Sequence, residues 1–338
     1  MTVKIGINGF GRIGRQVFKA IRKFYPDQLE VVAVNDIVPV ESLAYLLKYD
    51  SVYGRYPEAV EAGQGTLRVG SQEVQVLNLR SPAELPWEEL EVGIAIESTG
   101  LFTRREDTEK HLQAGAKRVI ITAPAKGPDI TVCLGVNEKA YDPAKHRVIS
   151  NASCTTNCLA PVAKVLDEEF GIVFGFLTTV HAFTGNQKLV DGPHKKLRRG
   201  RAAADSIVPT TTGAAIATTE VLPQLQGKMD GLAMRVPVLD GSIIDFVAQT
   251  EKPVTVEKVN QAFRRAAQRE DLKGILDITD EEWVSADVIG TTQSAIVDAP
   301  STMVLGDHMV KVLAWYDNEW GYACRVADLA SYIADKGV

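Results

Sequence analysis

Three glycines, Gly9, Gly11 and Gly14, follow the strand-like segment Val3–Asn8 in G-x-G-x-x-G spacing. In such a turn the first glycine permits a tight change of direction, the second lets the backbone approach a pyrophosphate, and the third allows close packing of a helix on the strand. The following helix directs its N-terminal amide groups at the phosphates. The spacing alone is also found in structural turns, but here a strand pattern precedes it and a helical pattern follows. We therefore expect the opening of a Rossmann-type dinucleotide-binding domain.

The next strand candidate, Leu29–Asn35, is followed directly by Asp36. A carboxylate about 20 residues beyond the glycine turn can accept hydrogen bonds from the adenosine ribose. It would also repel the 2′-phosphate of NADP, and the neighbouring Ile37 offers that phosphate no side-chain hydrogen bond. The alternative is a structural turn with Asp36 as a surface carboxylate. The prediction is a cofactor site for NAD in preference to NADP.

Strand and helix patterns alternate in the first half of the chain. Further strands are expected at Gly93–Glu97, Arg118–Thr122 and Arg147–Ser150, and a helix at Glu106–Ala114. This alternation predicts a parallel sheet covered on both faces. Because 338 residues exceed what one core usually sustains, two domains are expected.

The pattern changes after about residue 150. A helix is expected over Thr155–Phe170, where Pro161 must cause a kink or a late start. Two further strands, Gly231–Val238 and Ser242–Thr250, are separated by an Asp-Gly pair, which predicts a hairpin. The remaining expected elements are the strand Phe176–Phe183 and the helices Val254–Arg269 and Val326–Lys336. This half is therefore predicted to contain an antiparallel or mixed sheet.

Charge and cysteine content exclude several classes of protein. An overall net charge of −6 argues against a protein that binds nucleic acids or membrane surfaces through its overall charge. No apolar run approaches the ~18 residues that suggest a membrane span, and the start shows no export signal. The four cysteines suit a reducing compartment, and no second close pair completes a zinc site with Cys154 and Cys158. We expect a cytoplasmic protein with no metal, nucleic-acid or membrane partner.

The segment Ser150–Cys158 reads Ser-Asn-Ala-Ser-Cys-Thr-Thr-Asn-Cys and lies between a strand pattern and a helix pattern. A cysteine at a helix N-terminus experiences the helix macrodipole, which lowers the thiol pKa and raises its reactivity. Backbone amides at the same place could hold an oxyanion or a phosphate. A buried structural cysteine with Ser and Thr caps would show the same pattern, so these residues alone leave the role of Cys154 open.

Five motifs together resemble the glyceraldehyde-3-phosphate dehydrogenase family. They are Ile7–Arg15, Ser150–Cys158, Pro209–Ala215, Met234–Pro237 and Trp315–Tyr322, and they occur in the family's order. The resemblance implies an α/β protein with a Rossmann-type NAD-binding domain at 1–152, completed by a C-terminal helix at 319–338. It also implies an α+β catalytic domain at 153–318 with a mostly antiparallel sheet.

By this resemblance Cys154 is the nucleophile and His181 its partner. The thiolate attacks the aldehyde of glyceraldehyde 3-phosphate, and the imidazole acts as base when hydride leaves for the nicotinamide. Inorganic phosphate then attacks the thioester and releases 1,3-bisphosphoglycerate. The alternative for His181 is a buried histidine that makes its hydrogen bonds within the core and has no catalytic role. Two rival functions remain: an erythrose-4-phosphate dehydrogenase, which hydrolyses its thioester, and a non-catalytic binding protein on the same fold.

The family also implies two phosphate sites. The matching positions are Thr184 and Arg235 for the substrate phosphate, Ser153, Thr155, Thr212 and Gly213 for inorganic phosphate, and Arg199 for both. Guanidinium groups are permanently charged and bind oxygens in pairs, which suits such sites. Arg199 stands in the basic run His194–Arg201, for which a solvated or interface charge and a short nucleic-acid patch are the alternatives.

Further cofactor contacts follow from the same resemblance: Arg12, Ile13, Arg80, Ser98 and Thr122, with Asn318 at the nicotinamide carboxamide and Tyr322 near the ring. Pro193 matches the family's NAD-type pattern. The family also implies a homotetramer in which the segment 184–204 packs on a neighbouring subunit. Three features depart from the usual family sequence: Asn186 near the substrate phosphate, Phe183 in place of Tyr, and the run Val238–Ser242.

Overall fold

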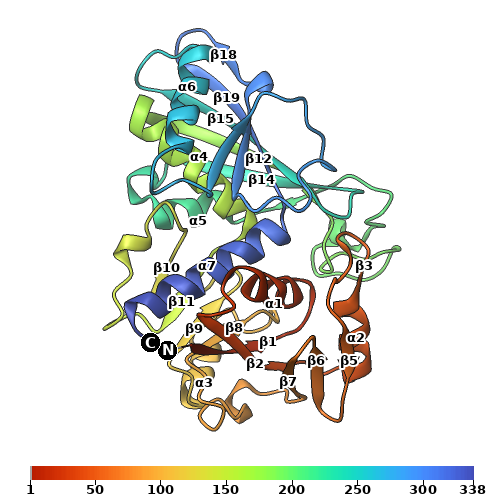
Figure 1. The fold of residues 1–338 in the computed structure, drawn as a ribbon. Coiled ribbons are helices and arrows are strands. Elements are labelled where there is room, and N and C mark those ends of the chain that lie inside the picture. The colour runs from red at the N-terminus through yellow and green to blue at the C-terminus, as the bar shows by residue number, and fades with distance from the viewer. Residues whose placement is uncertain (1) are drawn as a thin grey trace. The chain divides into compact units, whose positions relative to one another are not determined.

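A computed structural model describes residues 2–338 (Figure 1), and the chain forms two units. One unit contains the residues up to Val132 together with Lys139–Ala152 and Ala323–Val338. The other contains Cys133–Glu138 and Ser153–Tyr322. The C-terminal segment therefore joins the first unit from Ala323 onward. The domain limits expected from the sequence, 1–152 with 319–338 and 153–318, remain a prediction.

The first unit is built on a nine-stranded sheet in the order β10-β11-β9-β8-β1-β2-β7-β6-β5. Pairing is parallel from β10 to β7 and antiparallel at β6 and β5. The strands are β1 (Val3–Asn8), β2 (Leu29–Asn35), β5 (Val60–Ala62), β6 (Thr66–Val69), β7 (Gln72–Leu77), β8 (Ile94–Glu97), β9 (Arg118–Ile121), β10 (Ile130–Thr131) and β11 (Val148–Ser150). The parallel sheet predicted from the strand–helix alternation is confirmed.

Helices cover this sheet. Those that contact its strands are α1 (Arg12–Phe24), α2 (Val40–Lys48) and α3 (Arg105–Gln113). The later part of α7 (Trp320–Lys336) belongs to the same unit. The short strands β3 (Tyr49–Asp50) and β4 (Gly54–Arg55) lie beside α2, and short 3-10 turns occur at Pro82–Glu84 and Glu138–Ala140. The last helix is held to the N-terminal part of the chain by polar contacts. The Tyr25 hydroxyl lies 2.5 Å from a carboxylate oxygen of Asp328, and the Ser331 hydroxyl lies 2.6 Å from the side-chain carbonyl of Gln28.

The predicted start of the last helix, at Val326, is wrong, because α7 begins at Trp320. Its first turn is initiated by Asp317, whose carboxylate accepts the amide hydrogens of Glu319 and Trp320 at 2.9 and 2.7 Å. Residues 320–327, the first part of this helix, are buried on all faces of the helix. The apolar periodicity that reveals an amphipathic helix is therefore absent there.

The second unit contains an eight-stranded sheet in the order β13-β14-β12-β15-β19-β17-β16, with β18 paired to β19. Pairing is parallel between β12 and β14 and between β16 and β17, and antiparallel elsewhere. The strands are β12 (Ile172–Ala182), β13 (Val208–Thr211), β14 (Met229–Val236), β15 (Ser242–Thr250), β16 (Leu276–Thr279), β17 (Ala295–Asp298), β18 (Met303–Leu305) and β19 (Met309–Tyr316). The mostly antiparallel sheet is as expected.

The hairpin predicted at the Asp-Gly pair is wrong. Both strands exist, but β12 lies between them: Thr179 pairs with Ala233 of β14 on one side and with Ile244 of β15 on the other. Gly241 does adopt a positive φ of 84°, so the local turn signal was real. A turn dipeptide defines chain reversal but not the strand partner, and here the long strand β12 takes both partners.

Helix α4 (Cys154–Phe170) leads into β12, and α5 (Ala214–Val221) and α6 (Val256–Ala267) complete the second unit, with 3-10 turns at Leu197–Gly200, Pro223–Leu225 and Ala299–Ser301. The side chain of Ser153 caps α4 by accepting the amide hydrogen of Thr156 at 3.0 Å. The helix runs through Pro161 instead of starting after it. Cys154 is therefore the first residue of a capped helix.

Candidate active site

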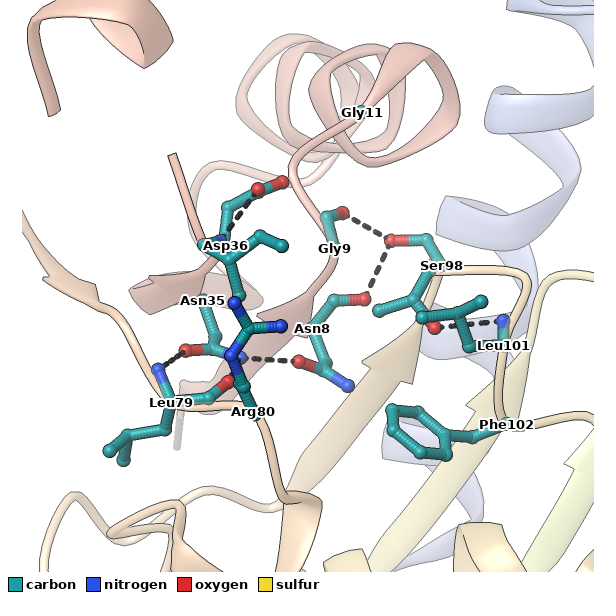
Figure 2. Close-up of a pocket in the computed structure, with 12 residues that line it drawn as sticks. Asn8, Gly9, Gly11, Asn35, Asp36, Leu79, Arg80, Ser98, Leu101 and Phe102 are labelled. Carbon is teal, nitrogen blue, oxygen red and sulfur yellow. Dashed lines mark hydrogen bonds between the residues drawn. The ribbon is translucent and has the colours of Figure 1, made fainter. Parts of the chain in front are cut away.

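Five of the expected cofactor residues, Gly9, Gly11, Asp36, Arg80 and Ser98, line a cavity of about 260 Å³ (Figure 2). The cavity lies where β1, β2 and β8 end, at the carboxyl edge of the parallel strands. Ligands of open α/β sheets bind outside this edge. The first unit therefore places the dinucleotide motif where a dinucleotide is normally held.

The three glycines of the turn have different surroundings. Gly9 has a φ of +92°, and a Cβ on it would meet the Thr99 amide nitrogen at 2.6 Å. A Cβ on Gly14 would lie 2.1 Å from the carbonyl oxygen of Gly9, so only glycine lets α1 pack this closely. A Cβ on Gly11 would meet nothing within 4 Å. The open space at Gly11 fits the close approach of a pyrophosphate to the backbone.

The Asp36 carboxylate makes hydrogen bonds to the glycine turn and to its own neighbour in the chain. It accepts the amide hydrogens of Phe10 at 2.9 Å and of Ile37 at 2.8 Å. A carboxylate has about four lone-pair sites, so these two bonds leave acceptor capacity for ribose hydroxyls. Asp36 thus ties the glycine turn to the end of β2 and still faces the cavity.

Other expected cofactor residues do not line the cavity. Arg12 pairs with Asp50 at 2.9 Å, and Gly14 acts through helix packing, as described above. The amide and hydroxyl of Thr122 both donate to the Glu97 carbonyl, at 3.0 and 3.2 Å. Ile13 is half-buried at the start of α1.

In the second unit, the sulfur of Cys154 lies 3.4 Å from Nε2 of His181, at the start of α4 and near the end of β12. The sequence predicted this partnership, and the structure brings the two side chains within hydrogen-bonding reach. His181 is 3% exposed, and its ring packs edge-on against Tyr316 with centroids 5.9 Å apart. Just before the pair, Ala152 has a φ of +54°, a strained conformation for a residue with a Cβ.

Tyr316 was not among the residues expected from the sequence. Its hydroxyl lies 2.9 Å from the hydroxyl of Thr155 and 2.8 Å from that of Thr179. It thus joins the first turn of α4 to β12 directly beneath the imidazole. The available signal was its place in the motif Trp315–Tyr322, which does not distinguish ring-supporting from cofactor-contacting residues.

The protonation of the pair differs from the sequence-based expectation. Burial raises the pKa of Cys154, and the opposing effects of Arg235 and of the Thr155 bonds do not offset it. The expected lowering of this pKa at the helix start is therefore not found. Burial and the charge of Arg235 lower the pKa of His181 to about 3. At neutral pH the pair consists of a thiol and a neutral imidazole.

Arg235 lies against the other side of the imidazole. Its Nη1 is 2.6 Å from Nδ1 of His181 and donates to the carbonyl of Ala182 at 2.8 Å, while Nδ1 is 2.7 Å from that carbonyl. Protonation of both ring nitrogens would place two cations in contact. Arg235 therefore keeps the imidazole neutral. With the ring hydrogen on Nδ1, that hydrogen is donated to the Ala182 carbonyl, and Nε2 is free to accept a proton.

Among the residues that the structure describes, the Arg199 guanidinium is bonded only to neutral groups, two of them in the motif Pro209–Ala215. It donates to the Thr210 hydroxyl at 2.9 Å, to the Thr211 carbonyl at 3.3 Å, and to the side-chain oxygen of Asn186 at 2.9 Å. Asn186, one of the departures from the family's sequence, is thus a direct partner of this guanidinium. The positive charge of Arg199 also acts on both His181 and Arg235.

The remaining expected phosphate residues lie at two helix starts and one strand end. Ser153 and Thr155 begin α4, Thr212 and Gly213 precede α5, and Thr184 follows β12. The Thr212 hydroxyl accepts the Ala214 amide hydrogen at 3.2 Å. Amides at helix N-termini bind anions well.

Asn318 is oriented by Ser242. The Ser242 hydroxyl donates to the side-chain carbonyl of Asn318 at 2.5 Å and accepts the Ala182 amide hydrogen at 3.1 Å. The amide NH₂ of Asn318 is thereby left as the group available to a carboxamide. Tyr322, expected near the nicotinamide, is buried at the start of α7, and burial raises its pKa well above the usual value.

In residues 2–338, no helix combines the length and apolar character that crossing a membrane requires. Over the same described residues, His, Cys, Asp and Glu side chains nowhere gather in a group of three or more that could hold a metal ion.

The first unit holds a dinucleotide-type cavity, and the second holds a cysteine–histidine pair with a buried imidazole. These are the features expected of a nicotinamide-dependent dehydrogenase that uses a thiol. Comparison with known families agrees. Residues 3–105 match the NAD binding domain of glyceraldehyde 3-phosphate dehydrogenase, and residues 153–318 match its C-terminal domain. The chain belongs to the glyceraldehyde-3-phosphate dehydrogenase family.

Curated relatives match over all or nearly all of their length. The glyceraldehyde-3-phosphate dehydrogenase of Geobacillus stearothermophilus is 59% identical over 338 residues, which is 100% of both chains. That of Streptomyces coelicolor is 54% identical over 336 residues, covering 99% of this chain and 100% of the relative. Glyceraldehyde-3-phosphate dehydrogenase 2 of Bacillus subtilis is 54% identical over 336 residues, covering 99% of this chain and 98% of the relative.

Proposed function

We propose that this protein catalyses the reversible, NAD-dependent oxidative phosphorylation of glyceraldehyde 3-phosphate to 1,3-bisphosphoglycerate. The observation that carries the proposal is the 3.4 Å contact between the Cys154 sulfur and the His181 Nε2. A thiol becomes an effective nucleophile only as a thiolate, so it needs a base within reach. His181, kept neutral by its surroundings, is that base.

The cofactor cavity fits NAD on the observations above: open space at Gly11, the carboxylate of Asp36, and close packing at Gly14. Gly9, Gly11, Asp36, Arg80 and Ser98 would hold the dinucleotide, with Asn318 oriented to bind its carboxamide. When bound, NAD supplies the acceptor for the hydride that leaves the substrate carbon.

The chain's own residues then account for the proton movements. Cys154 attacks the aldehyde carbon while Nε2 of His181 takes the thiol proton. His181 then passes this proton to the former carbonyl oxygen, which becomes the hydroxyl of a thiohemiacetal, and Nε2 is free again. As hydride leaves that carbon, Nε2 of His181 accepts the hydroxyl proton and a thioester remains. Inorganic phosphate attacks the thioester, the carbon–sulfur bond breaks, and the proton on His181 returns to sulfur.

Two cationic side chains in the second unit suit a reaction that must hold two phosphate groups, one on the substrate and one that attacks the thioester. Arg199 and Arg235 make no ion pair with a carboxylate of residues 2–338; their partners are hydroxyl, amide, carbonyl and imidazole groups. Burial lowers the pKa of both, which reflects the cost of holding a charge there without a counter-charge. We propose that the substrate phosphate binds Thr184, Arg199 and Arg235, and that inorganic phosphate binds Ser153, Thr155, Arg199, Thr212 and Gly213.

The test is a matrix of initial rates with NAD or NADP, with or without phosphate, and with glyceraldehyde 3-phosphate or erythrose 4-phosphate. We expect turnover with NAD and glyceraldehyde 3-phosphate only when phosphate or arsenate is present. Multiple turnovers without either would instead indicate a hydrolysing erythrose-4-phosphate dehydrogenase. Absence of turnover in every arm would indicate a binding protein.

We also propose a homotetramer. Apolar side chains stand exposed on the sheet of the second unit, with Phe176 68% exposed, and on the segment 184–204, with Leu189, Val190 and Leu197 between 69 and 85% exposed. Surfaces of this kind mark protein–protein contacts. The segment 184–204 would pack against a neighbouring subunit. Light scattering should give about four times 36.8 kDa; a monomer mass would contradict the tetramer.

A cytoplasmic location is proposed as well, because all four cysteines are free thiols. Fractionation of the source cells, with detection by antibody, should recover the protein in the cytoplasmic fraction.

A further inference from the structure

The carboxylate of Glu97, at the end of β8, is the centre of a buried hydrogen-bond network in the first unit. Glu97 is 2% exposed. It accepts hydrogen bonds from the side-chain amide of Asn8 at 2.6 Å, from Nε2 of His111 at 3.1 Å and from the amide of Thr99 at 2.8 Å. The Thr99 hydroxyl is also bonded to it. A carboxylate is buried only when its oxygens are satisfied in this way.

The neighbouring histidine has a defined tautomer. The indole N–H of Trp87 lies 2.9 Å from Nδ1 of His111, and both side chains are fully buried. An indole nitrogen can only donate, so Nδ1 accepts and the ring hydrogen sits on Nε2. His111 therefore donates to Glu97. All the hydrogen bonds described for the Glu97 carboxylate, from Asn8, Thr99 and His111, are therefore ones that it accepts.

The network ends at the cofactor cavity. Asn8 and Thr99, which donate to Glu97, both line that cavity, and Figure 2 shows Asn8 there. The oxygen of the Asn8 side chain accepts from the amide of Asn35 at 2.7 Å, and the oxygen of Asn35 accepts the Leu79 amide hydrogen at 2.9 Å. Asn35 and Leu79 line the cavity too. A continuous set of hydrogen bonds thus links the Glu97 carboxylate to four residues that line the cavity.

We propose that Glu97 is a positioning residue for the dinucleotide: its carboxylate sets the orientation of Asn8 and Thr99, and through Asn8 that of Asn35, in the form that binds NAD. Trp87 and His111 support it by presenting a fixed donor. The inference rests on the assignment of this cavity to NAD. It deepens that assignment by identifying a residue that acts on binding without touching the cofactor.

The variant Glu97→Gln tests the proposal because the two side chains have nearly the same shape. A glutamine must turn its NH₂ group toward one of the donors from Asn8, His111 or Thr99, which leaves a donor–donor clash or an unsatisfied group. We expect the Kd for NAD to rise about tenfold, the effect of losing roughly one buried hydrogen bond. At saturating NAD, kcat should stay within about twofold, because Cys154 and His181 belong to the other unit.

A double variant makes the test specific. Trp87→Phe removes the donor to Nδ1, so His111 can move its hydrogen to Nδ1 and accept, at Nε2, a hydrogen bond from the amide that Glu97→Gln introduces. The change in Kd caused by Glu97→Gln should therefore be smaller in the Trp87→Phe background than in the wild type. Asp129→Asn is the matched control, since Asp129 accepts the amide hydrogens of Arg147 and Val148 and does not line the cavity. It should lower the Tm and leave the Kd unchanged.

If Glu97→Gln does not fold, His111 offers a second pair. His111→Gln can still donate to Glu97 and accept from Trp87, so NAD binding should be unchanged. His111→Leu removes that donor and should raise the Kd about threefold. A wild-type Kd in both Glu97→Gln and His111→Leu, with only the Tm lowered, would overturn the proposal. A wild-type protein that binds no NAD would instead contradict the assignment of the cavity.

Discussion

Nε2 of His181 faces the Cys154 sulfur at 3.4 Å while Arg235 touches the opposite nitrogen of the ring. One imidazole is therefore shared between the nucleophile and a buried cation. The cation disfavours imidazolium, so the resting pair is uncharged and the proton moves only when the thiol reacts. Tyr316, whose hydroxyl is bonded to Thr155 and Thr179, packs edge-on against this ring.

Replacing the base should slow the chemistry without removing the nucleophile. His181→Asn keeps a polar side chain on β12 but cannot take the thiol proton or the hydroxyl proton. We expect kcat to fall by roughly 10²- to 10⁴-fold, the usual contribution of a general base, with a smaller change in the KM for NAD. Steady-state kinetics measures both values. Near-normal kcat would exclude His181 as the base.

The raised pKa of Cys154 predicts the pH dependence of alkylation. Because burial raises the thiol pKa above its ordinary value of 9.0, the thiolate fraction is small at neutral pH and grows as pH rises toward that raised pKa. The rate of alkylation by iodoacetamide in the free protein should therefore keep increasing between about pH 8 and 10.

The charge of Arg235 opposes the effect of burial on Cys154, so Arg235→Gln should move this alkylation profile to higher pH. A profile that reaches its plateau below pH 7 would contradict the assigned direction. Cys158, buried with its thiol against the Ala314 carbonyl, should not react in the folded protein, and mass spectrometry of the alkylated peptide distinguishes the two cysteines.

Asn186 offers a test of the phosphate assignment. Asn186→Asp is nearly isosteric and would give the Arg199 guanidinium a carboxylate partner in place of the neutral amide at 2.9 Å. A charge already paired binds phosphate less well, so the KM for inorganic phosphate or for the phosphorylated aldehyde should rise by about five- to tenfold. Asn186→Ser, which stays neutral, is the control and should change either KM far less. Equal effects of the two variants would argue against a charge effect at Arg199.

Ser242 should influence cofactor use through Asn318. Ser242→Ala removes the donor at 2.5 Å that orients the Asn318 amide. The amide could then rotate by 180°, and we expect the KM for NAD to rise about three- to tenfold as one hydrogen bond is lost. The KM for phosphate should not change. If the KM for NAD stays constant, Asn318 does not hold the carboxamide.

Local chemistry made some of these features predictable. The glycine turn, Asp36 and Cys154 are recognisable because each depends on a few adjacent residues, and the family motifs added His181 and the two arginines. The strand partners of β14 and β15, in contrast, depend on β12, which lies more than 40 residues upstream in the chain. The Asp-Gly signal could not reveal this.

The residues that the sequence did not reveal act through distant partners. Glu97 is linked to Asn8 across 89 residues, and Tyr316 to Thr155 across 161 residues. The pKa of Cys154 was expected to fall on helix position alone, but burial, which a linear pattern does not display, has the larger effect.

The most direct test of the central claim is a pre-steady-state measurement of NADH formation with excess glyceraldehyde 3-phosphate and NAD but no phosphate. A thioester on Cys154 predicts a burst of one NADH per subunit, followed by continued turnover only after phosphate is added, and no burst in Cys154→Ser. Steady turnover without phosphate, or a burst that survives in Cys154→Ser, would contradict the account.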